Sequence, residues 1–270
     1  MTNVLATLVG GYVVIVVVVY LVQRSLMYHP AGGLPAPSAT LAPEMAVVTQ
    51  TTSDSLDIVS WYAAATSGRP TLVYFHGNAG HIGDRDSKVR PYLDQGWGVL
   101  LAGYRGYGDN PGSPSEDGLY ADARAALAIL TERGIAPADV VVYGESLGTA
   151  VAVRMAWELA EAGAPARALV LEAPFNTMGY AAANAYPFLP ARILVKDRYD
   201  SESRIAAIAT PLLIFHGDRD RVVPMALGQR LFDAAREPKK SAWISGAGHN
   251  DLYDFGAAEK VLDFVHDLGR

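Results

Sequence analysis

A short glycine-flanked motif, Gly144-Glu145-Ser146-Leu147-Gly148, joins an aliphatic run at 140–143 to an alanine-rich stretch at 150–160. The first run is typical of a buried strand and the second of a helix. This order constrains the fold, because the two glycines let the backbone bend sharply where a larger side chain would crowd it. A serine at such a bend projects its hydroxyl from the turn. We therefore predict that Ser146 is a nucleophile; the alternative is an ordinary glycine-rich turn.

Candidate partners for this serine follow it in the chain. An apolar run at 211–215 ends in His216-Gly217-Asp218-Arg219-Asp220, and Gly248-His249 follows a second apolar segment. A serine hydroxyl is a poor nucleophile at neutral pH, so it needs a neutral imidazole to accept its proton and a carboxylate to orient that imidazole. The order serine, acid, histidine predicts Asp220 as the acid and His249 as the base.

Other titratable residues at strand ends compete for these roles. Asp218 and Glu172 are the alternatives to Asp220, since each also follows an apolar run. His76 and His216 each precede a glycine at a strand end, where a ring nitrogen can satisfy the backbone of a turn. We interpret these two histidines as structural.

The predicted oxyanion site lies after the apolar run at 71–75. That run breaks into His76-Gly77-Asn78-Ala79-Gly80, where small residues let backbone amides approach a substrate oxygen. We predict the N–H of Asn78 as one donor and the N–H of Leu147, the residue after the nucleophile, as the other.

Alternating apolar runs and helical stretches predict an α/β fold. Strands are expected at 45–51, 56–63, 71–75, 98–102, 140–143, 168–171, 212–215 and 242–244, the first two as an antiparallel pair. Buried aliphatic runs separated by helices are typical of a mostly parallel sheet with helices on both faces. The motifs follow strand ends, so they should gather at the carboxyl edge of the sheet, where open α/β folds bind ligands.

An uncharged stretch from Val4 to Val22 precedes this fold. A helix of about 19 residues at about 1.5 Å per residue is close to the thickness of a bilayer's hydrocarbon core. We predict a single transmembrane helix within residues 1–24. A cleaved signal peptide would need a basic start and a small-residue cleavage site, and a core strand would be shorter. Arg24 weakly favours a cytoplasmic catalytic domain by the positive-inside rule.

Proline and glycine content divides the rest of the chain. Residues 25–44 are predicted as an extended tether and 45–270 as the catalytic domain, with a short cap segment near 176–210. Apolar residues at 186–195 would suit an acyl chain if the cap lines the site; ordinary helix packing is the alternative.

Composition excludes several other classes of function. The net charge of −6 without a basic stripe argues against nucleic-acid binding. The chain has no cysteine, and its six histidines lack metal-ligand spacing, so we expect no metal or cofactor.

Several motifs together are similar to those of a known family, the membrane-anchored alpha/beta-hydrolase-domain serine hydrolases. The motifs are His76-Gly77-Asn78-Ala79-Gly80, Tyr104-Arg105-Gly106-Tyr107-Gly108, Gly144-Glu145-Ser146-Leu147-Gly148, Glu172-Ala173-Pro174-Phe175 and His216-Gly217-Asp218-Arg219-Asp220. The resemblance covers nearly everything after Ser25. It implies the alpha/beta-hydrolase fold, a triad at Ser146, Asp220 and His249, and cleavage of esters or thioesters, including those of acylated lipids and proteins.

This chain departs from the family at two points. Asn110 stands where the family pattern has a serine, and the cysteine cluster that carries lipid in depalmitoylating relatives is missing. Within the Tyr104–Gly108 motif, we interpret the two tyrosines as packing residues and Arg105 as a link between loops; an anionic head group is the alternative ligand for Arg105.

We therefore predict a single-pass membrane serine esterase or thioesterase whose partners are an acyl-bearing substrate and membrane lipid. Residues that select the substrate remain unknown. The alternatives are a serine peptidase and a non-catalytic membrane scaffold built on the same core.

Overall fold

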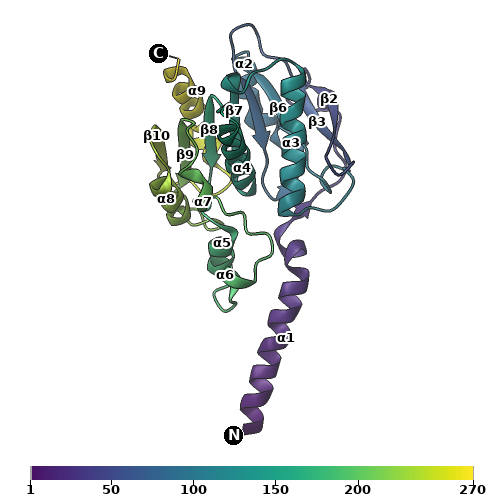
Figure 1. Ribbon diagram of the computed structural model, residues 1–270, viewed down its shortest axis with the longest axis vertical. Helices are drawn as coiled ribbons and strands as arrows, with labels where there is room; N and C mark the ends of the chain where they lie inside the picture. Colours follow the sequence, from purple (N-terminus) through teal and green to yellow (C-terminus); the bar gives the residue numbers. More distant parts are fainter. Residues whose placement is uncertain (1, 270) are drawn as a thin grey trace.

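The computed structural model describes residues 2–269, which form a compact body and one long helix that extends away from it (Figure 1). This helix, α1 (Thr2–Met27), continues past the predicted anchor boundary at residue 24. Its segment Val4–Met27 has 24 residues, a mean hydropathy of 2.6 and no residue buried in the protein. The helix is therefore long and apolar enough to cross a membrane.

An eight-stranded sheet forms the centre of the body, in the order β10-β9-β8-β7-β4-β6-β3-β2. The strands β4, β6, β7, β8, β9 and β10 are parallel, while β2 and β3 form an antiparallel pair beside β6. Their bounds are β2 Ala46–Thr51, β3 Asp57–Ala63, β4 Thr71–Phe75, β6 Gly98–Ala102, β7 Val140–Glu145, β8 Ala168–Glu172, β9 Leu212–Gly217 and β10 Lys239–Ile244.

Helices cover both faces of the sheet (Figure 1). One apolar core holds α3 (Glu116–Glu132), α4 (Leu147–Glu161) and α8 (Met225–Ala234) against the sheet. The other core holds α2 (Asp86–Asp94) and α9 (Ala257–Asp267) against the opposite face. This arrangement confirms the predicted alpha/beta-hydrolase fold.

The predicted bounds of β4 and β6 match the structure, whereas β7 and β9 each run two residues further than predicted. The main difference is β10, which begins at Lys239 rather than at Ala242. Its first three residues, Lys239, Lys240 and Ser241, are only partly buried or exposed, because β10 is an edge strand. Their polar side chains hide the strand from a search for apolar runs.

The segment after α1, predicted as an extended tether, is hydrogen-bonded to the body of the protein near its start. Its first residues form β1 (His29–Pro30), which pairs in parallel with β5 (Ala79–Gly80), and a 3-10 turn, η1, follows at Pro37–Ala39. This pairing, which the sequence did not predict, fixes the base of α1 to the loop after β4.

The predicted cap region contains two helices that project from the body on the side of α1 (Figure 1). These are α5 (Met178–Ala185) and α6 (Ala191–Leu194); a further short helix, α7 (Glu202–Ile205), leads back to β9. Further short 3-10 turns are η2 (Ile82–Arg85), η3 (Pro137–Asp139) and η4 (Leu252–Phe255).

Candidate active site

Ser146 lies in a sharp turn between β7 and α4. Its backbone has φ 50° and ψ −114°, a conformation that residues with a side chain rarely adopt. The turn is packed tightly: a Cβ on Gly144 would lie 2.4 Å from the Gly148 carbonyl oxygen, and one on Gly148 would lie 2.0 Å from the Phe75 oxygen. Only glycine fits at either position, so the sequence motif has a direct steric cause.

His249 joins the serine to a carboxylate. Its Nε2 lies 3.0 Å from Ser146 Oγ, and its Nδ1 lies 2.6 Å from Asp220 Oδ2. The three side chains come from the turn after β7, the loop after β9 and the loop after β10. The parallel sheet thus brings together residues that are 103 positions apart in the sequence.

The Asp220 carboxylate is held from several directions. The N–H groups of Val222 and Val223 each donate to Oδ1 at 2.8 Å. His216 Nε2 lies 3.1 Å from Oδ2 and 2.8 Å from the Val223 carbonyl oxygen, so this nitrogen carries a proton. Burial alone would raise the pKa of Asp220, but the hydrogen bonds from His216 and His249 outweigh it and hold the pKa below its ordinary value.

The two alternative acids lie elsewhere. Asp218 accepts hydrogen bonds from Ser245 Oγ at 3.0 Å and from the Gly246 N–H at 2.8 Å. Glu172 accepts from Tyr143 at 2.6 Å and from Lys88 at 2.8 Å. Of the three carboxylates, Asp220 is the one hydrogen-bonded to His249.

A buried charged cluster lies next to the nucleophile turn, and the sequence analysis did not predict it. Glu145 pairs with Arg85 at 3.0 Å and with Lys88 at 3.2 Å, and Lys88 also reaches Glu172. Burial would raise the pKa of Glu145, but the cations of Lys88 and Arg85 outweigh it and hold the pKa below the ordinary value. The two cations lie about 60 residues before Glu145, so no local motif links them to the nucleophile turn.

The loop after β4 brings Asn78 to the cavity that Ser146 lines. Asn78, Ser146 and Leu147 line one cavity, and Leu147 is the first residue of α4, where amides have no partner within the helix. The Asn78 carbonyl oxygen accepts from His29 N–H and Tyr107 Oη, both at 2.8 Å, and its side chain donates to the Met27 carbonyl oxygen at 2.7 Å.

The remaining candidates have structural contacts. His76 is fully buried, with Nδ1 2.8 Å from the Gly77 carbonyl oxygen, and burial together with the Arg85 charge lowers its pKa to about 3. Arg105 pairs with Asp54 in the turn between β2 and β3 and with Asp122 of α3, so it links its own loop to that turn and to the helix.

Asn110, which occupies the family's serine position, also has a structural role. Its Oδ1 accepts from the Val59 N–H at 2.8 Å, and its Nδ2 donates to the Tyr104 carbonyl oxygen at 3.2 Å. The asparagine thus connects β3 to the Tyr104–Gly108 loop.

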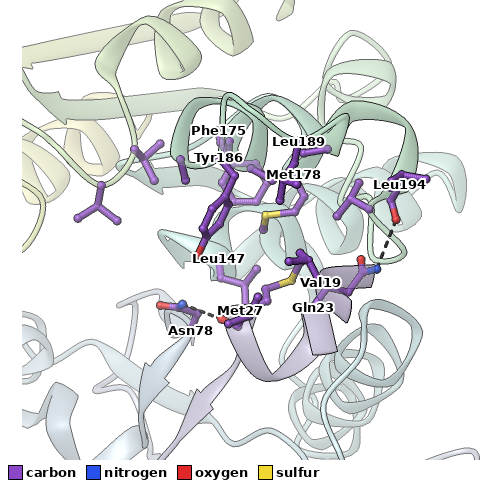
Figure 2. A pocket seen from close by; sticks show the side chains of 18 of the residues that line it. Val19, Gln23, Met27, Asn78, Leu147, Phe175, Met178, Tyr186, Leu189 and Leu194 are labelled. Carbon is purple, nitrogen blue, oxygen red and sulfur yellow. Dashed lines mark hydrogen bonds between the residues drawn. The ribbon is translucent and has the colours of Figure 1, made fainter. Parts of the chain in front are cut away.

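An apolar cavity of about 280 Å³ opens beside Ser146. One wall comes from α1 and the other from α5, α6 and the segments around them, as Figure 2 shows for Val19 and Met27 opposite Met178 and Leu189. Within residues 2–269, no group of three or more His, Cys, Asp or Glu side chains is arranged to hold a metal ion.

Comparison with known proteins gives matches at the levels of sequence and fold. The family Hydrolase_4, described as "Serine aminopeptidase, S33", matches residues 66–198. An uncharacterized protein of Mycobacterium tuberculosis is 43% identical over 233 residues, which are 85% of this chain and 81% of that protein. Human alpha/beta hydrolase domain-containing protein 17B is 32% identical over 224 residues, 81% of this chain and 74% of that protein.

Two further matches are more limited in what they share. The lysophosphatidylserine lipase ABHD12 of Danio rerio is 36% identical over 196 residues, 66% of this chain, and the match spans only 51% of the lipase. Among solved structures, an esterase of Pyrococcus furiosus has a TM-score of 0.72 at 20% identity, over 90% of this chain and 98% of the esterase. At that identity the likeness concerns the fold.

Proposed function

Because this chain belongs to the alpha/beta-hydrolase family, we propose that it is a membrane-anchored serine hydrolase that cleaves carboxylic ester or thioester bonds of acyl-bearing substrates. One observation carries the proposal: Ser146, His249 and Asp220 form a continuous hydrogen-bonded chain at the end of an apolar cavity. The chain of bonds suits acyl transfer, and the cavity suits an aliphatic acyl group.

The reaction begins when Ser146 Oγ attacks the acyl carbonyl carbon and its proton passes to His249 Nε2. Asp220 stabilises the imidazolium through the hydrogen bond from Nδ1. The N–H groups of Asn78 and Leu147 stabilise the oxyanion, and loss of one such donor costs about 3 to 4 kcal/mol.

The C–O or C–S bond then breaks, and His249 donates its proton to the leaving alcohol or thiol. The acyl group is now an ester of Ser146 Oγ. Water attacks this ester while His249 accepts a proton, Ser146 takes that proton back, and a carboxylic acid is released. Both half-reactions need His249 to be neutral when it accepts a proton.

The helix α1 provides the membrane anchor in this proposal. Its last turn carries Arg24, so the positive-inside rule favours a cytoplasmic catalytic domain on a single-pass helix. A protease-sensitive tag appended to Arg270 tests the orientation. Cleavage of the tag by a protease added outside intact cells contradicts a cytoplasmic domain.

A fluorophosphonate probe tests the catalytic role of Ser146. The expected result is covalent labelling of the purified full-length protein in detergent, abolished in Ser146→Ala, together with loss of p-nitrophenyl ester hydrolysis in that variant. An acyl-thioester assay run in parallel ranks the two bond types. A folded protein that neither reacts with the probe nor hydrolyses any ester supports the scaffold alternative, and cleavage of aminoacyl arylamides in place of esters supports a peptidase.

A further inference from the structure

The tip of the cap, around Phe188, lies alongside the middle of α1, well before the C-terminal end of that helix. The Tyr12 hydroxyl donates to the Phe188 carbonyl oxygen at 2.9 Å, and Gln23 Nε2 donates to the Leu194 oxygen at 3.4 Å. Tyr12 and Gln23 are eleven residues apart, or about 16 Å along a helix. Tyr12 lies in the middle of the uncharged stretch 4–22. Any bilayer that surrounds this stretch therefore also surrounds the backbone of Phe188.

The cap has the composition and exposure of a membrane-inserted element. Phe188 and Ile193 are 63% and 76% exposed, and Tyr186 is also exposed. In a protein surrounded by water such a cluster is unfavourable, whereas in hydrocarbon it is favourable.

The charge nearest the tip points away from it. Arg192 is the one charged residue between Met178 and Val195. Its guanidinium lies 4.0 Å from the centre of the Tyr180 ring, and the guanidinium of Arg230 in α8 lies 4.3 Å from the same ring. Arg192 is thereby directed toward the body of the protein, where the headgroup region would lie.

The apolar surface formed by α1 and the cap ends, on the side of the sheet, at a group of polar residues that we call the boundary: Gln23, Arg24, Lys196 and Asp197. Arg24 pairs with Asp197 at 2.8 Å, and Gln23 Oε1 accepts from the Lys196 N–H at 2.7 Å. Apart from Arg192, charged side chains thus begin at the same level on α1 and on the segment that follows α6. This level is where the hydrocarbon region should end.

The cavity beside Ser146 crosses this boundary. On the N-terminal side of Gln23, α1 lines the cavity with Val16 and Val19; beyond Gln23, the lining includes Met27, Leu147 and Ser146. Figure 2 shows Val19, Met27 and Leu147 around this cavity. Val16 and Val19 are partly buried, while their neighbours Val17 and Val18 are exposed, so one face of α1 forms the wall.

We propose that the cap segment 178–195 is inserted in the hydrocarbon region and that an acyl chain enters the site sideways from the same bilayer, between α1 and the cap. The occupant is the aliphatic chain of a bilayer-resident ester or thioester, with its reactive carbonyl at the boundary level beside Ser146. Cleavage at Ser146 rests on the proposed function, whereas insertion of the cap does not.

Depth-dependent fluorescence tests the insertion without any need for activity. The chain has no cysteine, so an environment-sensitive dye attached to Phe188→Cys in the full-length protein, reconstituted in phosphatidylcholine vesicles, reports on one site. The expected result is a blue-shifted emission that brominated acyl chains quench. No such change is expected for Thr131→Cys, an exposed position at the C-terminal end of α3. Water-like, unquenched emission from Phe188→Cys overturns the insertion, and the same experiment on Ser146→Ala shows whether catalysis matters to it.

A pair of adjacent substitutions tests the path of the acyl chain. Val19→Trp fills the cavity on the N-terminal side of the boundary, whereas Val18→Trp places the same ring at nearly the same depth on an exposed face of α1 that does not line the cavity. Val19→Trp is expected to lower the ratio of palmitoyl to butyryl ester hydrolysis by about tenfold, because each methylene displaced from an apolar site weakens binding several-fold. Val18→Trp should leave that ratio unchanged. An unchanged ratio in Val19→Trp, or an equal fall in both variants, overturns the path; a parent protein that hydrolyses neither ester contradicts the proposed function and leaves the fluorescence result standing.

Discussion

Replacement of Asp220 by asparagine gives the sharpest test of the catalytic assignment, because its surroundings fix how the new side chain must lie. Oδ1 accepts from the N–H groups of Val222 and Val223, each at 2.8 Å. An asparagine NH₂ group at that position would face two backbone donors, against the single donor His216 Nε2 at the Oδ2 position, so the amide oxygen stays at the Oδ1 position. The NH₂ group then takes the place of Oδ2, which lies 2.6 Å from His249 Nδ1.

This orientation inverts the role of His249. The NH₂ group donates to Nδ1, so the ring proton moves to Nε2, the atom that lies 3.0 Å from Ser146 Oγ. Nε2 can then no longer accept the serine proton. We expect kcat to fall on the order of 10⁴-fold, or about 5 kcal/mol of transition-state stabilisation, as for the same change in other serine hydrolases. KM should change little, since the cavity lining is intact.

Steady-state hydrolysis of p-nitrophenyl butyrate measures the effect, with a thermal melt of each variant to establish folding. Asp218→Asn is the matched control: its carboxylate binds Ser245 and Gly246 and makes no hydrogen bond to His249. That variant should keep kcat within about twofold, as is usual for surface changes. The reasoning is refuted if folded Asp220→Asn retains more than a tenth of the parent kcat, or if Asp218→Asn loses as much.

Three further predictions concern the surroundings of the site. Asn78→Ala keeps the backbone N–H but removes the hydrogen bond from the side chain to the Met27 carbonyl oxygen. The kcat for ester hydrolysis should therefore fall by less than about tenfold, whereas loss of an oxyanion donor costs about 10²- to 10³-fold. A larger fall in kcat would mean that the side chain itself binds the oxyanion. Lys88→Met leaves Glu172 with an unpaired buried charge and should lower the free energy of unfolding by about 3 to 5 kcal/mol; urea denaturation that gives less than 1 kcal/mol contradicts this. The lowered pKa of Asp220 means that its charge stabilises the fold above its unfolded-state pKa of about 4, and that this stabilisation is lost as pH falls further. The difference in urea stability between the parent and Asp220→Asn should therefore shrink below about pH 4, and a constant difference from pH 7 to pH 3 would rule the linkage out.

The sheet and the position of the motifs could be predicted because the relevant signals are local. Phe75 was expected to end a strand and does so as the last residue of β4. Aliphatic runs buried on both faces are visible in the sequence, and the carboxyl ends of parallel strands meet at one edge whatever their separation along the chain. The proximity of Ser146 and His249 follows from this topology.

The choice among carboxylates could not be predicted in the same way. Asp218 and Asp220 follow β9 and Glu172 is the last residue of β8, so all three lie at the end of an apolar run in the sequence. What distinguishes Asp220 is the turn after it, which directs two backbone N–H groups at one carboxylate oxygen and leaves the other for histidines. His216 was interpreted as a backbone partner, and it also contacts Asp220, because the same turn folds back over its ring.

The packing of α1 against the site could not be predicted from the sequence either, because a uniformly apolar helix does not show which of its faces contacts the rest of the protein. The stretch 4–22 meets the requirement for a membrane span without reference to any partner. The polar residues that end α1 show a further role, since a simple tether would leave them in water. Arg24 instead pairs with Asp197, Tyr28 contacts Asp197 and Tyr199, and β1 continues these contacts into the loop that carries Asn78. The end of the helix is thus bonded both to the segment that follows the cap helices and to the loop of the proposed oxyanion site, so the same few residues connect α1 to two walls of the cavity.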